Sequence, residues 1–270
     1  MTNRLELNWR LDGFVDEQRY YRSETPIDIN NLPAPKAVLA GDVRMYTDSG
    51  IIPGDVYHVR VSSVKNEVEK PGDEIIIATN HYLYLPLTHN LKDFGKHNLT
   101  ATSFGGAVIQ NGCLYVPPGG YVELNTLGLS DFNINTGDFE FGVEVCLIPG
   151  GSGDYPSIFA LGTNWGNGAV SMQYNPQRKF MGAFHGISTE VDAFSPINQI
   201  EDDLTFIKYK VRRVAGVVTT YADNVAGASI NDSMPIDLTK NGVITIGAAT
   251  WALSVTKSHS KIRNLYLKKI

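Results

Sequence analysis

Three carboxylates, Asp138, Glu140 and Glu144, are spaced so that they could act as a general acid and base. Residues an even number apart share one face of a β-strand. At about 3.3 Å per residue, Glu140 and Glu144 would lie about 13 Å apart, and Asp138 and Glu140 about 7 Å apart. Retaining glycosidases hold their carboxylates about 5–5.5 Å apart and inverting ones about 6.5–9.5 Å. Glu140 and Glu144 fall outside both ranges, and Asp138 and Glu140 reach only the inverting range. Solvated carboxylates on a half-exposed strand are the simpler expectation, and no catalytic residue is assigned.

Other reactive side chains form no recognisable site. The six histidines lack a metal-ligand spacing such as His-x-x-x-His, and Cys-x-x-Cys, Gly-x-Ser-x-Gly and phosphate-binding glycine loops are missing from the sequence. The two cysteines, Cys113 and Cys146, are either unpaired buried thiols or a bridge between adjacent strands. No cofactor or metal is assigned.

One segment has the composition of a sugar-binding loop, because an aromatic ring stands among amides and glycines. An indole can stack on a sugar ring while amides hydrogen-bond to its hydroxyls. The alternative is that the tryptophans are partly buried residues of a β-sandwich. The candidate ligand-binding residues are Asn164, Trp165, Asn167, Tyr155 and Trp251.

The composition of the chain indicates an all-β protein with room for two domains. Its 270 residues are 43% hydrophobic, which supports a sizeable core, and its 26 Gly and 13 Pro are spread along the chain as short strands with many turns require. A net charge of −5 argues against nucleic-acid binding, which needs a basic surface. The first residues hold no apolar run like that of a signal peptide, and no stretch is long enough to span a membrane. We expect synthesis in a cytoplasm and no membrane insertion.

In residues 1–79, apolar and polar side chains alternate as they do in the half-buried strands of a β-sandwich. Leu5, Leu7 and Trp9 alternate with polar residues, which predicts a strand over 4–11. Further strands are predicted near 17–23, 55–64 and 73–79.

The segment Ile51 to Tyr57, Ile-Ile-Pro-Gly-Asp-Val-Tyr, resembles the E–F corner of fibronectin type III domains. Trp9 stands where that family has its B-strand tryptophan, and residues 20–23 resemble its C strand. The resemblance implies a tyrosine corner, in which the Tyr57 hydroxyl bonds to backbone just upstream while the ring fills the core. It also leaves little room for the family's opening strand. We expect the exposed edge of 4–11 to be covered by a partner or by the second domain.

Residues 80–270 continue as strands and turns, with almost no linker after residue 79. The order of motifs resembles laminin G/concanavalin A-like jelly rolls, with Asn224 replacing the glycine of a Tyr-x-Asp-Gly turn. Asparagine also tolerates a positive φ, so the turn is expected to survive. Many members of that fold bind Ca²⁺ through loop oxygens, but no calcium site can be matched residue by residue. The motifs are Phe104-Gly-Gly-Ala107, Gly119 to Leu124, Phe139 to Val143, the hairpin 208–221, Tyr221 to Val225, 244–247 and 262–267.

Two sandwich modules without a secretion signal and with few cysteines are typical of bacteriophage structural proteins. We expect a non-enzymatic virion protein of the tail or tail tip, made in the host cytoplasm. Its partners would be other virion proteins in a multi-subunit assembly, and its second domain would contact host-surface glycan or a neighbouring subunit. The alternatives are a capsid decoration or cement protein and a glycan-processing hydrolase. A basic group near the C-terminus is either a solvated strand face or a contact for an acidic partner; it consists of Lys257, Lys261, Arg263, Lys268 and Lys269.

Overall fold

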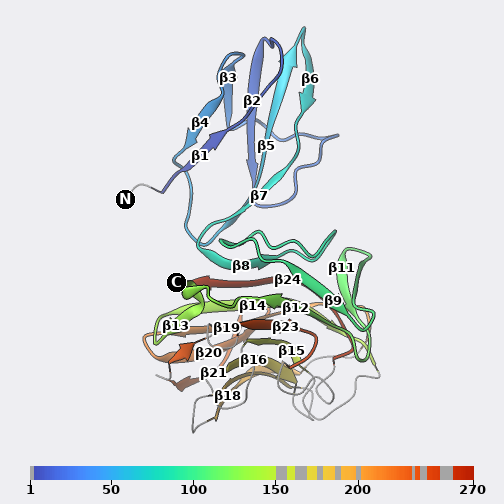
Figure 1. Cartoon of the computed structure of the whole chain (residues 1–270), viewed down its shortest axis with the longest axis vertical. Coiled ribbons are helices and arrows are strands. Elements are labelled where there is room, and N and C mark those ends of the chain that lie inside the picture. The colour runs from blue at the N-terminus through green and yellow to red at the C-terminus, as the bar shows by residue number, and fades with distance from the viewer. Residues whose placement is uncertain are drawn as a thin grey trace. The chain divides into compact units, whose positions relative to one another are not determined.

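The computed structural model describes residues 3–149, 157–161, 169–174, 179–185, 190–198, 202–232, 235–237, 242–249 and 258–270. The chain divides into two compact units, Met1–Asn80 and His81–Ile270. Figure 1 shows that both are built from strands. Across the described ranges the helical content is one 3₁₀ turn, η1, at Ser130–Phe132. The predicted all-β sandwich class is confirmed.

The first unit contains two antiparallel sheets. One pairs β1 with β4, and the other has the order β3-β2-β5-β6, with β7 also paired to β5. The predicted second strand has the bounds expected, whereas the strand expected over 4–11 is shorter. The strands are β1 (Leu5–Asn8), β2 (Glu17–Ser23), β3 (Ala37–Ala40), β4 (Met45–Asp48), β5 (Val56–Lys65), β6 (Val68–Pro71) and β7 (Ile75–Ala78).

The core of the first unit lies between these two sheets. Tyr20, Tyr57 and Val59 of the larger sheet are buried, and Leu5 and Leu7 of β1 pack against them from the smaller sheet. The backbone N–H of Ile52 donates a hydrogen bond of 2.9 Å to the Tyr57 hydroxyl, and Tyr57 is only 3% exposed. The hydrogen bond that the 51–57 motif predicts is therefore confirmed.

A buried carboxylate connects the two sheets on the β4 side. Asp48, at the end of β4, accepts hydrogen bonds from the Tyr20 hydroxyl at 2.9 Å and from the Arg22 guanidinium at 2.7 Å, both on β2. Burial raises the pKa of Tyr20, so its hydroxyl remains a donor at all ordinary pH values. Because a buried charge is tolerated only when it is paired, Asp48 fixes β2 against β4.

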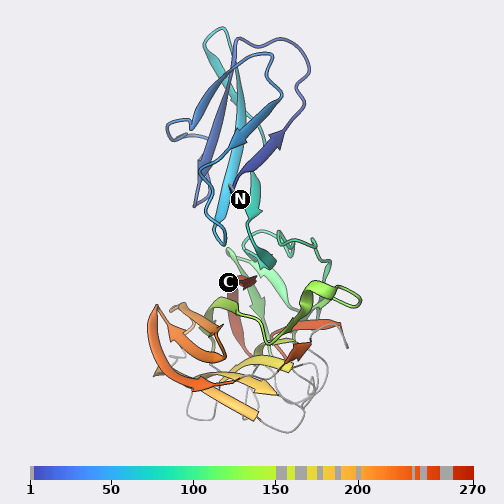
Figure 2. The same cartoon turned by 90° about the vertical axis from the view of Figure 1, so that its left-hand side faces the viewer.

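The second unit consists of two large antiparallel sheets and a short ribbon that pairs β13 with β22. The first sheet has the order β10-β11-β24-β14-β19-β20-β21, and β8 also pairs with β24. In Figures 1 and 2 the early strand β8 and the late strand β24 lie side by side. The strands of this sheet are β8 (His81–Leu85), β10 (Val108–Gln110), β11 (Cys113–Val116), β14 (Phe139–Leu147), β19 (Ile207–Val214), β20 (Val217–Ala222), β21 (Val225–Asn231) and β24 (Ser260–Lys269).

The second sheet has the order β18-β17-β16-β15-β23-β12-β9. Its strands and those of the ribbon are β9 (Ala101–Phe104), β12 (Tyr121–Asn125), β15 (Ser157–Leu161), β16 (Ala169–Tyr174), β17 (Lys179–His185), β18 (Glu190–Asn198), β23 (Val243–Ile246), β13 (Asn133–Asn135) and β22 (Ile236–Asp237).

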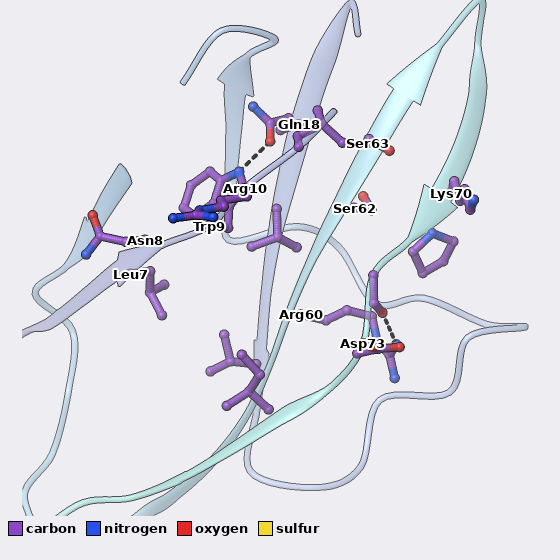
Figure 3. A pocket seen from close by; sticks show the side chains of 16 residues that line it. Leu7, Asn8, Trp9, Arg10, Gln18, Arg60, Ser62, Ser63, Lys70 and Asp73 are labelled. Carbon is purple, nitrogen blue, oxygen red and sulfur yellow. Dashed lines mark hydrogen bonds between the residues drawn. The ribbon is translucent and has the colours of Figure 1, made fainter. Parts of the chain in front are cut away.

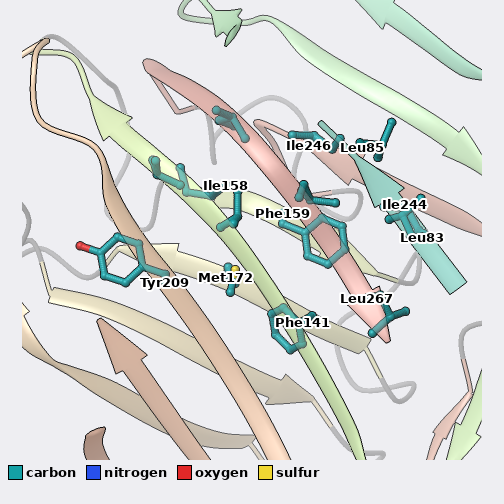
Figure 4. Packing of buried hydrophobic residues seen from close by; sticks show 14 of the residues in the cluster. Leu83, Leu85, Phe141, Ile158, Phe159, Met172, Tyr209, Ile244, Ile246 and Leu267 are labelled. Carbon is teal, nitrogen blue, oxygen red and sulfur yellow. The ribbon is translucent and has the colours of Figure 1, made fainter. Parts of the chain in front are cut away.

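A continuous apolar layer joins these sheets (Figure 4). The ring of Phe141 on β14 meets that of Phe159 on β15, with centroids 5.9 Å apart. Burying each such side chain contributes about 1.5–3 kcal/mol, which makes this layer the main source of stability. Two sheets enclosing one apolar layer are the architecture that the motif order predicted for this region.

Two turns of the second unit also follow their sequence signals. The predicted hairpin forms between β19 and β20, and its turn residues Ala215 and Gly216 have φ values of 49° and 74°. Positive φ at both turn positions matches the twist of paired strands. In the next turn Asn224 has φ 67°, as expected for a residue that replaces glycine.

The two cysteines are both free and buried. Cys113 lies on β11 and Cys146 on β14, and β24 runs between these strands. Two strand spacings place them about 9–10 Å apart, whereas bridged Cα atoms lie within about 7 Å. The bridge between adjacent strands that the sequence left open is therefore wrong.

Replacing Tyr57 with Phe tests the tyrosine corner. The substitution removes the acceptor for the Ile52 N–H while it keeps the buried ring. We expect the free energy of unfolding to fall by about 1–2 kcal/mol, measured by denaturant titration of the full chain. Tyr46→Phe in the same core is the matched control, and an equal loss in both variants would argue against the corner.

The thiols offer a second test. Burial raises the pKa of Cys146 to about 11 and also raises that of Cys113, so both remain thiols at neutral pH. We expect two titratable thiols in the unfolded, unreduced chain and slow reaction in the native chain, because the thiolate is the nucleophile. Detection of fewer than two would restore the bridge.

Candidate functional site

The residues predicted to form a sugar-binding loop lie outside the described residues. They are Asn164, Trp165, Asn167, Tyr155 and Trp251. Whether they come together therefore stays a prediction from the sequence.

The candidate catalytic carboxylates lie on or beside β14, and the structure gives each of them a partner. Glu140 is only 7% exposed and accepts a hydrogen bond of 2.9 Å from the hydroxyl of Tyr266. Its carboxylate also lies 3.4 Å from the Lys268 ammonium and 3.9 Å from that of Lys210. The expectation that Glu140 is solvated is wrong, because the flanking strands β19 and β24 place cations and a tyrosine over it.

Glu144 and Asp138 are similarly occupied. The Arg263 guanidinium donates to Glu144 at 2.7 Å, and the Asn264 amide donates to it at 3.0 Å. Asp138 accepts a hydrogen bond of 2.8 Å from the backbone N–H of Ala215, at the hairpin turn. These contacts hold strands and turns together, and they leave none of the three carboxylates poised as a general acid or base.

Three of the five basic residues near the C-terminus have acidic partners within the chain. Lys261 pairs with Asp203 at 2.6 Å, and Arg263 and Lys268 pair with the β14 carboxylates described above. Lys257 lies outside the described residues. Among the residues that the structure describes, no group of three or more His, Cys, Asp or Glu side chains could hold a metal ion.

The first unit contains a groove of about 400 Å³ (Figure 3). We call it the β1 groove, because β1 and the residues after it form one wall. Residues of β5, β6 and β7 form the opposite wall. It is lined by Leu7, Asn8, Trp9, Arg10, Leu11, Gln18, Val59, Arg60, Val61, Ser62, Ser63, Lys70, Pro71, Gly72, Asp73 and Ile75.

A buried amide fixes the first wall of the β1 groove. Gln18 of β2 is 1% exposed, and its side-chain oxygen accepts a hydrogen bond of 2.5 Å from the Trp9 indole, drawn in Figure 3. Its amide nitrogen donates to the carbonyls of Val43 at 2.6 Å and Gly41 at 3.2 Å. Gln18 thereby holds the chain after β1 and the chain before β4 against the larger sheet.

The β1 groove is positively charged. Its lining has three cations, Arg10, Arg60 and Lys70, and one carboxylate, Asp73. Arg60 is paired with Glu74 at 3.7 Å and its side chain is only 11% exposed, so Arg10, Lys70 and Asp73 set the charge of the groove, which is 2 − 1 = +1. Arg60 donates to the carbonyl of Gly72, but its Nε atom is buried without a hydrogen-bond partner.

The sequence predicted no groove here, because its walls come from three separate segments.

The comparisons with known proteins support the fold. No family model matches, and no curated protein matches in sequence. The receptor-binding domain of botulinum neurotoxin mosaic serotype C/D matches with a TM-score of 0.52 and 11% identity, over 71% of this chain and 48% of that chain. The binding domain of Paraclostridial Mosquitocidal Protein 1 matches with a TM-score of 0.54 and 10% identity, over 70% of this chain and 49% of that one.

The binding domain of botulinum neurotoxin DC, solved with rat synaptotagmin II, has a TM-score of 0.52 and 15% identity, over 71% of this chain and 49% of that chain. The chain thus spans about half the length of these structures. At such identities the likeness shows a β-rich, jelly-roll-like fold of the lectin type.

No helix in the described part of the chain is long and apolar enough to cross a membrane.

Replacing Glu140 with Gln tests its structural role. The change leaves Lys210, Arg212 and Lys268 close together without their shared counter-charge. We expect the free energy of unfolding to fall by about 2 kcal/mol. Glu123→Gln on β12 is the matched control and should change stability by less than about 0.5 kcal/mol. Equal stability of the two variants would show that Glu140 is not a structural ion pair.

Proposed function

We propose that this chain is a non-enzymatic structural and binding protein of a bacteriophage virion, located in the tail or at the tail tip. The observation that carries the proposal is the second unit, a lectin-type jelly roll whose candidate catalytic carboxylates are held in structural contacts. Such a unit can present loops to a ligand while it performs no hydrolysis. Fold alone does not name a ligand, so the proposal also draws on the rest of the chain.

The first unit, residues 1–79, is proposed to be a fibronectin type III-like module. The two-stranded sheet β1-β4 opposite β3-β2-β5-β6, with the hydrogen-bonded Tyr57 between them, supports this assignment. Such modules commonly act as spacers or docking platforms. This role fits a component that carries a binding unit on a larger assembly.

The second unit, residues 80–270, is proposed to contact host-surface glycan or a neighbouring subunit. The structures that resemble it are described as receptor-binding domains. One was solved with synaptotagmin II, and one is described as dependent on two ganglioside molecules for cell entry. Those ligands belong to those proteins, of which this chain covers about half, and they support glycan or protein contact as the proposed role.

The partners and location follow from the same reasoning. Other virion proteins in a multi-subunit assembly are the expected partners, and synthesis takes place in the host cytoplasm. The net charge of −5 disfavours nucleic acid as a ligand.

A glycan array that includes bacterial surface polysaccharides tests the proposal with the full chain. We expect binding that Trp165→Ala or Trp251→Ala weakens about tenfold or more, because ring stacking contributes on the order of 1.4 kcal/mol or more. Phe14→Ala removes a 92% exposed aromatic side chain in the first unit and is the control expected to bind normally.

Failure of the full chain to bind any polysaccharide or host cell would favour capsid decoration instead. Hydrolysis of a glycan by the unmodified chain, lost in Glu140→Gln, would identify an enzyme.

A further inference from the structure

Strand β1 has one edge that no other strand occupies in the described structure. It pairs with β4 alone, in the register Leu5↔Asp48 to Asn8↔Met45. The N–H of Trp9 donates to the carbonyl of Arg44, which continues this register. Because backbone groups alternate in direction along an antiparallel strand, the odd residues face β4. The N–H and C=O groups of Glu6 and Asn8 therefore point to the open edge.

The β1 groove runs beside this open edge and has an apolar lining. Leu7 forms part of the first wall, and Val59, Val61 and Ile75 form part of the second. Ile75 is 58% exposed although it lies on β7 of a packed sandwich. A strand added at the edge would direct alternate side chains into this lining and so complete the apolar layer between the sheets.

The opposite edge of the groove is protected against strand addition. Ser62 of β5 pairs with Pro71, whereas Val59 pairs with Ile75, so the pairing shifts by one residue between β6 and β7. Proline, lysine and a bulge are the devices by which sheet edges avoid pairing, and this edge carries Pro71, Lys70 and the shift. β1 is short and carries Glu6, but it has no proline, lysine or bulge, and its inward residues are leucines.

The charge of the groove selects among polypeptide strands. Apart from the Arg60–Glu74 ion pair, its lining has a formal charge of 2 − 1 = +1 from Arg10, Lys70 and Asp73, whereas the whole chain has −5. A strand with carboxylates near Arg10 and Lys70 would neutralise these charges, whereas a basic strand would be repelled.

We propose that the β1 groove binds an extended acidic segment of a partner protein, which pairs with the open edge of β1. Its apolar side chains enter the groove between the sheets, and its carboxylates meet Arg10 and Lys70. Main-chain hydrogen bonds to Glu6 and Asn8 supply affinity, and the side chains supply specificity. This docking surface is separate from the glycan contact proposed for the second unit.

Two labelled peptides probe the groove in the full chain. One alternates valine with glutamate and threonine over about eight residues, a usual strand length. Its twin replaces each glutamate with lysine. We expect fluorescence anisotropy to give a dissociation constant below about 1 mM for the acidic peptide. The lysine twin should bind at least about tenfold more weakly.

Variants at one position separate strand pairing from other modes of binding. Asn8→Pro removes the N–H that points to the open edge and leaves the hydrogen bonds to β4 in place. An edge strand accommodates proline at such a position, because the missing N–H is not needed for pairing. Asn8→Ala removes only the side chain. We expect Asn8→Pro to weaken the acidic peptide about tenfold or more and Asn8→Ala to change it less than about twofold. Thermal unfolding of both variants verifies that the first unit is intact.

Amide hydrogen exchange locates the bound peptide. Protection of Glu6 and Asn8 on addition of the acidic peptide supports the proposal. Failure of the acidic peptide to bind, equal binding of its lysine twin, or equal binding by Asn8→Pro and Asn8→Ala would each overturn it. A dimer of the chain that Asn8→Pro dissociates in sedimentation would overturn it too, because the groove would then hold a second copy. Glycan binding does not depend on these outcomes, so the two proposals can fail separately.

Discussion

Each unit encloses an apolar layer between two β-sheets, and polar side chains must close that layer wherever strands end. Gln18 and Asp48 perform this closure in the first unit, each reaching from one sheet to the other. In the second unit the fully buried Arg213 donates to the carbonyls of Asn135 and Gly137. Since a buried polar group costs free energy unless it is hydrogen-bonded, these contacts determine how the sheets meet. In the first unit, the β1 groove lies where polar side chains no longer cover the apolar layer.

Much of the fold could be read from local patterns. The alternation of Leu5 and Leu7 and of Phe139 to Val145 placed two strands, and the spacing around Tyr57 placed a hydrogen bond. These features depend on neighbours within a few residues. The short strands β3, β4 and β6 escaped prediction, because four residues are too few to establish an alternation from the sequence.

The candidate sites were harder to predict, because they depend on which distant strands become neighbours. Glu140 is covered by Tyr266 and Lys268 of β24, and nothing near Glu140 in the sequence announces that pairing. Gly142 lies below the same tyrosine ring, where a Cβ would come within 2.7 Å of it. The β1 groove likewise combines Leu7 with Ile75. Register between remote strands is fixed by the whole sheet, so composition alone cannot supply it.

The pairing of β8 with β24 has a consequence for how the nascent chain folds. Leu83 pairs with Leu267, so β8 gains this neighbour only after β24 has left the ribosome. β24 also lies between β11 and β14, and their sheet stays divided until then. Every pairing of the first unit closes within Met1–Asn80. We expect the first unit to fold during translation, while the second waits with its apolar strands open to chaperones.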